Sequence, residues 1–233
     1  MLTLLTFGPS FEMPSHSPFC VKAMALLHLS GQDWQPKYLS DPRKMPLGRL
    51  PVLKTAEGRL IPDSAHIQAY LEAEGAAFDA GLSAQDKARS HALIRMVEGH
   101  LAAGMAHDRW LRDECWPEVR EAFFNRVPRM MRGPVSGMIR RKVRAAMMIN
   151  GIAQFSEEER LARLAQDLET ISTTLGTGPF LFGERPTAAD AAIAPVLDMI
   201  RTLPCDTGLR RLVRGSPALM GYIKRARAAL YPM

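Results

Sequence analysis

The chain has 233 residues, of which 47% are apolar and 23% are charged, a balance typical of globular proteins. No apolar run approaches the roughly 20 residues that a membrane-spanning helix needs, and the first ten residues lack the basic start and long apolar centre of a signal peptide. The net charge is +6, with all of the excess after residue 75. We therefore expect a cytoplasmic protein.

Residues 1–75 have the pattern of a small α/β unit. The apolar run LTLLTF predicts a strand, and residues 18–29 place apolar side chains at helical spacing. WQPKYL suits an edge strand, because Pro36 has no amide hydrogen. LPVLKTAEGRLIP predicts two strands around a turn at Glu57 and Gly58, and DSAHIQAYLEAEG predicts an amphipathic helix. The order β-α-β followed by β-β-α fits a four-stranded sheet.

From about Leu82 onward strand patterns are absent. The predicted helices cover residues 84–112, 118–124, 156–175, 187–203 and 217–229. Pro and Gly residues between 128 and 137 interrupt the middle of this half, before MIRRKVRAAMMI resumes helical periodicity. EAEGAAFDAGLSA is poor in bulky residues and suits a linker. We predict an α/β domain of residues 1–75 followed by an all-helical domain of residues 84–233.

The three cysteines, Cys20, Cys115 and Cys205, are odd in number and widely spaced. This spacing argues against a disulfide framework and against a zinc site of the CxxC type. The histidines follow no metal-ligand pattern, and the motifs GxGxxG, GxxxxGK[ST] and HExxH do not occur. The sequence therefore predicts no metal and no bound nucleotide.

A basic cluster in the second half has no acidic residue between its members, which are Arg126, Arg129, Arg132, Arg140, Arg141, Lys142 and Arg144. Such a face could attract anionic ligands, nucleic acid or lipid headgroups. We favour its interpretation as a solvated helical face with arginine stems packed on apolar neighbours. No aromatic residues interleave with the basic ones to stack on bases. We expect no nucleic-acid partner and keep a membrane surface as an alternative.

The stretch SPFCVKAM allows two interpretations of Ser17. Serine is a favoured N-cap and proline a favoured first helical residue, so the stretch is a well-formed helix start. A helix N-terminus also stabilises an anion, and a hydroxyl there could donate to a bound thiolate, whose pKa of ~8.5 would need to fall by roughly one to two units. Cys20 is either a buried small hydrophobe or the site of one-thiol chemistry, because Ser17 occupies its CxxC partner position.

Two further segments, at Pro51 and at Asp63, have residue types that suit a binding site. Pro51 begins an apolar strand, which suits a cis Leu50-Pro51 bond that turns backbone groups toward a ligand. Asp63 and Ser64 precede a helix, and either could be its N-cap. In a functional interpretation, Ser64 and the helix amides would bind a carboxylate while Asp63 binds an ammonium. Together they suit the end group of an α-amino acid.

These segments resemble the glutathione S-transferase superfamily. SPFC matches its active-site position, GRLPVL its cis-proline segment and PDSAHIQAYLE its glutamyl-binding segment. GPFLFGERPTAADAAIAPVLDMI is similar to the family signature FLxGdxpTxADaalaP, in which Thr187 and Asp190 form an N-capping box. The resemblance covers most of the chain and implies a thioredoxin-like domain followed by an all-helical domain.

Within the superfamily, the helical half is similar to the failed-axon-connections and metaxin-like branch and its bacterial relatives. The segments that carry this similarity are DRWL, WPEVREAFF and RRKVRAAMMINGIAQFSEEE. Some members of that branch have interaction or transport roles.

Carried over residue by residue, the resemblance implies that Ser17 would hydrogen-bond the glutathione sulfur. Leu50, beside the cis proline, would pair its backbone with the cysteinyl part, and the remaining peptide contacts would complete a glutathione-binding set of Lys44, Leu50, Pro51, Asp63 and Ser64. In that set Asp63 and Ser64 would hold the γ-glutamyl end, and Lys44 would reach the glycyl carboxylate. The electrophile would bind between the domains against Phe19, His107, Arg109 and Trp110.

Trp110 is as well explained as core filler, and Arg109 as a solvated surface residue. The prediction is a homodimeric enzyme that ionises glutathione, its co-substrate, and conjugates it to a small electrophile without a metal. One alternative is a non-catalytic interaction module on the same fold, docking at a membrane through the basic cluster. Another is a thiol oxidoreductase that uses Cys20.

Overall fold

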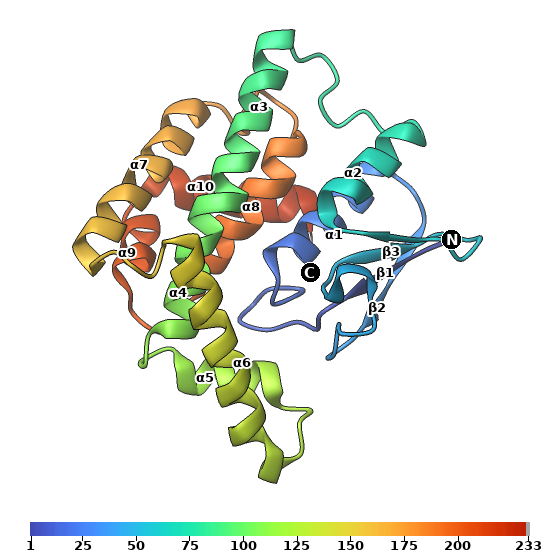
Figure 1. Cartoon of the computed structure of the whole chain (residues 1–233). Helices are drawn as coiled ribbons and strands as arrows, with labels where there is room; N and C mark the ends of the chain where they lie inside the picture. The colour runs from blue at the N-terminus through green and yellow to red at the C-terminus, as the bar shows by residue number, and fades with distance from the viewer. Residues whose placement is uncertain (232–233) are drawn as a thin grey trace.

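The computed structural model describes residues 1–231 and has the predicted order, an α/β half followed by a helical half (Figure 1). The first half consists of β1 (Leu2–Thr6), α1 (Pro18–Ser30), β2 (Trp34–Tyr38), a short 3-10 turn η1 (Pro46–Gly48), β3 (Val52–Lys54), β4 (Leu60–Pro62) and α2 (Ser64–Ala73). The strands form one sheet in the order β2-β1-β3-β4. β1 and β2 are parallel, and the other two pairs are antiparallel. β2, which contains Pro36, is an edge strand as predicted.

The helical half consists of α3 (Ala84–Met96), a π-helical segment η2 (Val97–Leu101), α4 (Ala102–Leu111), α5 (Trp116–Phe124), α6 (Arg129–Asn150), α7 (Glu157–Leu175), α8 (Ala188–Arg201), α9 (Gly208–Arg214) and α10 (Pro217–Leu230). α3, η2 and α4 follow one another without a break and together match the long helix predicted over residues 84–112. None of the described helices is long and apolar enough to cross a membrane.

Helix α1 lies between the sheet and α8, where the two halves meet (Figure 1). Nine of its residues are buried, and all of these except Lys22 are apolar, as expected for a helix inside a core. Lys22 is 1% exposed, and its Nζ is 2.7 Å from Oε1 of Glu98 on η2. Gly31 ends the helix with φ 67°, a left-handed conformation that favours glycine. Helix α1 is therefore packed into the junction of the two halves.

The start of α8 confirms the predicted interaction of Thr187 and Asp190. The fully buried Asp190 carboxylate accepts from the Thr187 amide and hydroxyl, both at 2.8 Å, from the Leu181 amide at 3.0 Å and from the Tyr222 hydroxyl at 2.9 Å. Burial raises the pKa of Asp190, and these donors oppose the rise. The four bonds tie α8 to the preceding loop and to α10.

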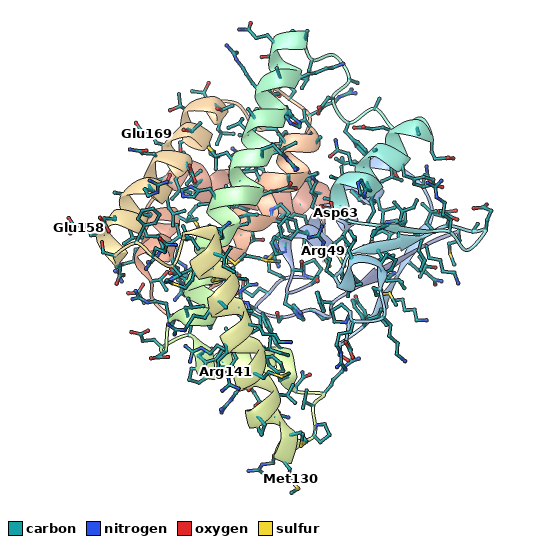
Figure 2. All side chains as sticks on the ribbon, in the orientation of Figure 1. Arg49, Asp63, Met130, Arg141, Glu158 and Glu169 are labelled. Carbon is teal, nitrogen blue, oxygen red and sulfur yellow. A yellow bond between two sulfur atoms is a disulfide. The ribbon has the colours of Figure 1, made fainter. Side chains whose placement is uncertain are left out.

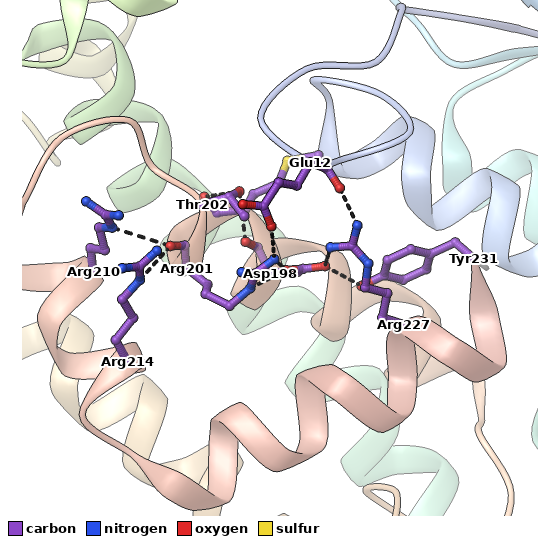
Figure 3. Close-up of polar contacts among 9 residues, drawn as sticks. Glu12, Asp198, Arg201, Thr202, Arg210, Arg214, Arg227 and Tyr231 are labelled. Carbon is purple, nitrogen blue, oxygen red and sulfur yellow. Dashed lines mark hydrogen bonds and ion pairs between the residues drawn. The ribbon is translucent and has the colours of Figure 1, made fainter. Parts of the chain in front are cut away.

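The loop between β1 and α1 is anchored on the helical half by a polar cluster (Figure 3). Arg201 donates to Oε2 of Glu12 at 3.0 Å, and Arg227 donates to the Glu12 carbonyl at 2.5 Å. Both arginines also bond to Asp198, which is fully buried, at 2.7 and 3.2 Å. The helical half thereby positions the loop that leads into α1.

Two helix predictions were wrong. α6 runs unbroken through the Pro and Gly residues expected to interrupt it, with Pro134 inside the helix. Pro134 is exposed, so water can satisfy the Met130 carbonyl that proline leaves without an intrahelical partner. α9 was not predicted, because seven residues are too few to establish a period.

The prediction of no disulfide framework was also wrong. Cys115 and Cys205 form a disulfide whose Cα atoms are 5.0 Å apart, although 90 residues separate them. Cys115 precedes α5 and Cys205 follows α8, and helix packing brings these two ends together. Structural disulfides are typical of oxidising compartments, so this bond does not favour the predicted cytoplasmic location.

Candidate functional site

Two cavities meet at the start of α1. The first has a volume of about 380 Å³ and is lined by Ser17, Pro18 and Phe19 among others. The second has a volume of about 370 Å³ and is lined by the Leu50-Pro51 segment, the start of α2 and again Phe19. Phe19, on the first turn of α1, is therefore a wall residue of both cavities.

Ser17 occupies the N-cap position of α1, but its side chain makes no capping hydrogen bond. Its carbonyl accepts from the amides of Cys20 and Val21, both at 3.1 Å, and so begins the helix. Ser17 is among the residues that line the first cavity, and its side chain also contacts the Cys20 thiol. The backbone of Ser17 therefore starts the helix, while its side chain does not cap it.

The first cavity is mainly apolar and aromatic. Besides the α1 turn, it is lined by Phe7, His16, Ser40, Pro42, Ala102, Met105, Arg109, Trp110, Phe123, Phe124 and Ile139. Of the predicted electrophile-site residues, Phe19, Arg109 and Trp110 are part of this wall. His107 is not among the lining residues of the described cavities; it is buried, with Nδ1 3.3 Å from Oδ1 of Asp108. Successive helical residues are about 100° apart, so His107 and Arg109 face different sides of α4.

His16 is held between two aromatic rings in the wall of the first cavity. Its imidazole stacks on Phe7 with ring centroids 4.4 Å apart and on Phe123 at 4.2 Å. Burial, and secondly the charge of Arg109, lower the pKa of His16 to about 3. At neutral pH His16 is therefore a neutral aromatic surface.

Arg109 is 4% exposed, which excludes the solvated surface position considered from sequence. Its Nη1 donates to the His16 carbonyl at 2.8 Å, and its guanidinium carbon is 5.6 Å from the centroid of the Phe123 ring. Its Nε is buried and has no hydrogen-bond partner among the described residues. Burial lowers the pKa of Arg109 to about 10, so the side chain remains a cation at neutral pH.

The second cavity has the backbone geometry expected from the sequence. The Leu50-Pro51 peptide bond is cis, as predicted. Asp63 rather than Ser64 caps α2, because Oδ1 of Asp63 accepts from the Ala65 amide at 3.0 Å. Ser64 is the first residue of α2; it is 3% exposed and lines the cavity.

Charges of both signs line the second cavity. Oδ2 of Asp63 accepts from Arg49 at 2.9 Å, and Figure 2 shows these two side chains next to each other where the halves of the molecule meet. Arg95 and Glu98, which form an ion pair on the helical half, line the same cavity. Lys44 is exposed and lines none of the described cavities. Its proposed contact with the glycyl carboxylate stays a prediction.

The sequence reasoning missed Arg49, Arg95 and Glu98. Arg49 is next to the predicted Leu50, so its proximity to Asp63 follows once the cis-proline turn is in place. Arg95 and Glu98 lie on the helical half, and no sequence spacing brings them to the start of α2. The aromatic cavity wall was missed as well, although the pair Phe123 and Phe124 is visible in WPEVREAFF.

Cys20 is fully buried in a small apolar cluster with Leu5, Leu50 and Val52. Burial raises the pKa of its thiol, and contacts with Thr6 and other neighbours oppose this. A buried thiol with a raised pKa is a poor nucleophile. Among the residues that the structure describes, no group of three or more His, Cys, Asp or Glu side chains is placed to hold a metal ion.

Comparison with known families gives two matches. The family described as "Glutathione S-transferase N-terminal domain" matches residues 18–115, and "Glutathione S-transferase, C-terminal domain" matches residues 154–225. Together they include both cavities' main elements, α1, α2, α3 and α4, and the capped start of α8. The segment between the two matches contains α5 and α6.

Individual relatives differ in what their names say. Isoprene-epoxide–glutathione S-transferase of Rhodococcus sp. (strain AD45) is 27% identical over 236 residues, covering 97% of this chain and 98% of the relative. Metaxin-1 of Sus scrofa is 24% identical over 239 residues, covering 99% of this chain and 75% of the relative. The structure of glutathione transferase GSTFuA3 from Phanerochaete chrysosporium superposes with a TM-score of 0.68 at 18% identity, covering 100% of this chain and 98% of that one. At that identity the likeness concerns the fold.

Proposed function

The chain belongs to the glutathione S-transferase superfamily, and on that premise we propose that it binds glutathione and transfers its thiolate to a small apolar electrophile. The observation that carries the proposal is that Phe19 lines two cavities of different character, and that Ser17, two residues earlier, lines the first of them. The second cavity is polar and charged, and the first is mainly apolar. A peptide thiol in the second cavity would have its sulfur at the start of α1, facing an electrophile in the first.

The second cavity complements the γ-glutamyl end of glutathione. That end is a zwitterion, and the wall offers carboxylates of Asp63 and Glu98 together with guanidinium groups of Arg49 and Arg95. Ser64 and the N-terminal amides of α2 would hold the carboxylate. Neither backbone group of Leu50 has a backbone partner within residues 1–231, so both can pair with the cysteinyl part.

The chemistry needs an ionised thiol. The Ser17 hydroxyl would donate to the sulfur, and the positive end of the α1 dipole would add to this stabilisation. Both effects favour the thiolate and lower the thiol pKa. The sulfur then attacks an electrophilic carbon, a C–S bond forms, and the bond to the leaving oxygen or halide breaks. The relative named for an isoprene epoxide supports a small apolar electrophile for this chain.

The test compares Ser17→Ala with Ser40→Ala in glutathione conjugation of a generic aryl halide. Both variants remove one hydroxyl from the wall of the first cavity. We expect Ser17→Ala to raise the pKa of bound glutathione by roughly one to two units and to lower kcat/KM at neutral pH by about 10- to 100-fold. Ser40→Ala should stay close to the wild type.

Two results would count against this proposal. If Ser17→Ala keeps wild-type kcat/KM across the pH range, Ser17 does not act on the sulfur. If calorimetry of the wild type with millimolar glutathione gives no heat, the glutathione site itself is refuted. The expected homodimer and the cytoplasmic location remain predictions.

A second candidate, a non-catalytic module that docks on a membrane, is favoured by α6. This helix buries one residue, Ser136. Five of the ten large apolar side chains that are exposed in the described chain belong to it, namely Met130, Met131, Met138, Met148 and Ile149. Figure 2 shows Met130 at the free end of α6, away from the body of the molecule.

The outward face of α6 combines this apolar stripe with cations. At about 100° per residue, Met130, Met138 and Met148 fall within about 80° of one another, and Arg141 lies on the same side. Four basic residues of this region form no ion pair within residues 1–231, namely Arg126, Arg129, Arg141 and Lys142. Apolar side chains flanked by basic ones are the pattern of an interfacial helix on anionic lipid.

Co-sedimentation with vesicles tests this candidate. We expect binding to phosphatidylglycerol-containing vesicles that weakens with salt, and weaker binding after Met130→Gln, Met148→Gln and Ile149→Gln are combined. Leu212→Gln, an exposed apolar residue on α9, is the control. Equal binding to neutral and anionic vesicles, or binding to duplex DNA alone, would refute it. The Cys20 oxidoreductase has no comparable support, because its thiol is fully buried.

A further inference from the structure

Arg109 is a buried cation without a counter-ion. It is 4% exposed, and no carboxylate in residues 1–231 lies within the 4.0 Å of an ion pair. Its one hydrogen bond from Nη1 goes to a neutral backbone carbonyl, that of His16, and its Nε has no partner. A guanidinium has five donors, so most of its capacity is unused.

No neighbouring charged group acts as a counter-ion for Arg109. Asp108, the adjacent acid, lies beside the His107 ring. Its charge acts instead on Arg112 and Arg160, on the other side of α4. His16 is neutral at physiological pH because its pKa is about 3. Arg109 is therefore the single charged side chain among the lining residues of the first cavity.

An unpaired buried charge destabilises a fold because it loses its hydration, and natural proteins rarely carry one without a partner. A buried cation needs an anionic partner, and the described chain supplies none for Arg109. Because Arg109 lines a cavity, a bound ligand can supply that partner. An arginine fork matches a carboxylate in geometry and charge. The surrounding wall of Phe7, Phe123 and Trp110 would accommodate a flat apolar body.

We propose that Arg109 binds a carboxylate on the electrophile, so that the substrate is a small apolar or aromatic carboxylate with an electrophilic carbon at its other end. This inference rests on the proposed transferase function. Arg109 and Ser17 line the same cavity. A carboxylate held at Arg109 would orient the electrophilic carbon toward the sulfur. Arg109 is in this sense a specificity-determining residue.

The test uses two aryl chlorides that differ in one group, a chloronitrobenzoate and the matching neutral chloronitrobenzamide. In both reactions the glutathione sulfur bonds to the ring carbon, the C–Cl bond breaks and chloride leaves. Each kcat/KM is divided by the uncatalysed rate constant to remove intrinsic reactivity. Wild type should prefer the benzoate by about 10- to 100-fold, the value of one hydrogen-bonded charged group.

Three variants isolate the contribution of Arg109. Arg109→Met should lower the benzoate-to-benzamide ratio of kcat/KM to about 1, because only the benzoate loses a charged partner. Arg109→Lys should keep part of the preference, because charge remains while the fork is lost. Arg141→Met, exposed on α6, changes the net charge equally and should leave the preference intact.

The outcomes separate this inference from the function on which it rests. An equal fall of both rates in Arg109→Met would mean that Arg109 acts on the thiolate, and would overturn the proposal. No preference in wild type would also overturn it. If the wild type conjugates neither compound, the transferase proposal fails, and calorimetry with benzoate and benzamide still tests the anion site. Tighter binding of benzoate that is lost in Arg109→Met would then support it.

Discussion

Two residues at helix starts show how little their identity says about their role. Asp63 and Ser17 both occupy N-cap positions, and both residue types are favoured there. The Asp63 side chain caps α2, whereas the Ser17 side chain makes no capping bond and lines a cavity. The difference follows from surroundings: the Ser17 side chain contacts the Cys20 thiol, while the Asp63 carboxylate has the Ala65 amide at 3.0 Å.

His16 provides a prediction at the residue scale. Its folded-state pKa of about 3 is below the value of 6.5 in the unfolded chain. Between these values the unfolded chain binds the proton and the folded one does not, so stability falls as pH falls from about 6.5 toward 3. The slope contributed by His16 should be about 1 kcal/mol per pH unit.

His16→Phe keeps an aromatic ring between Phe7 and Phe123 and removes the titration. The difference in unfolding free energy between pH 7 and pH 5, measured by urea denaturation, should be smaller in this variant by about 1–2 kcal/mol. His66→Phe is the control, since His66 is exposed. An unchanged pH dependence in His16→Phe would mean that His16 is protonated in the folded protein.

At the scale of elements, the loop between β1 and α1 depends on the helical half. Phe11 and Glu12 have positive φ values of 48° and 61°, a region that non-glycine residues rarely adopt. The bonds from Arg201 and Arg227 to Glu12 hold this turn (Figure 3). A strained turn persists when its surroundings fix it, and here the surroundings are α8 and α10.

Arg201→Ala should loosen this loop. It removes the contacts to Glu12 and to the buried Asp198, so we expect a loss of about 1–3 kcal/mol in unfolding free energy. Amide exchange of the loop should accelerate, and the KM for glutathione should rise because Ser17 follows the loop. Arg214→Ala is the matched control, because Arg214 bonds to the Arg201 carbonyl rather than to the loop. Equal exchange in both variants would contradict this anchoring role.

At the scale of the whole molecule, the two halves share one hydrophobic core. Leu4 and Val21 from the α/β half belong to the same buried cluster as Ile193 and Leu197 from α8. The helix that presents Ser17 is thus inside this common core. In contrast, α5 and α6 extend from the body (Figure 1), and the disulfide from Cys115 fixes the start of α5 next to the end of α8.

The disulfide should contribute measurably to stability. Because it closes a loop of 90 residues, its removal in a Cys115→Ala, Cys205→Ala double variant should cost about 2–4 kcal/mol. Thermal unfolding should show a lower Tm for the wild type in reductant, close to the Tm of the double variant. The double variant itself should not respond to reductant. A wild-type Tm that is the same with and without reductant would refute a stabilising role.

The sequence by itself determined the order of elements, the helix starts and the cis Leu50-Pro51 bond. These depend on local chemistry: an amide missing in proline, a hydroxyl before a helix, or apolar side chains repeating with the helical period. The contiguous helix α6 was missed because Pro134 is exposed, so water can satisfy the carbonyl that proline leaves without an intrahelical partner.

The tertiary structure decided which side chains meet. The partnership of Arg109 with the His16 carbonyl, the approach of Arg95 and Glu98 to the cis-proline turn and the Cys115–Cys205 bond all join segments far apart in the chain. Their meeting depends on how whole helices pack against the sheet, and packing sums many weak contacts that no short stretch of sequence contains. Local sequence supplied the chemical groups, and the shared core arranged them into two adjoining cavities.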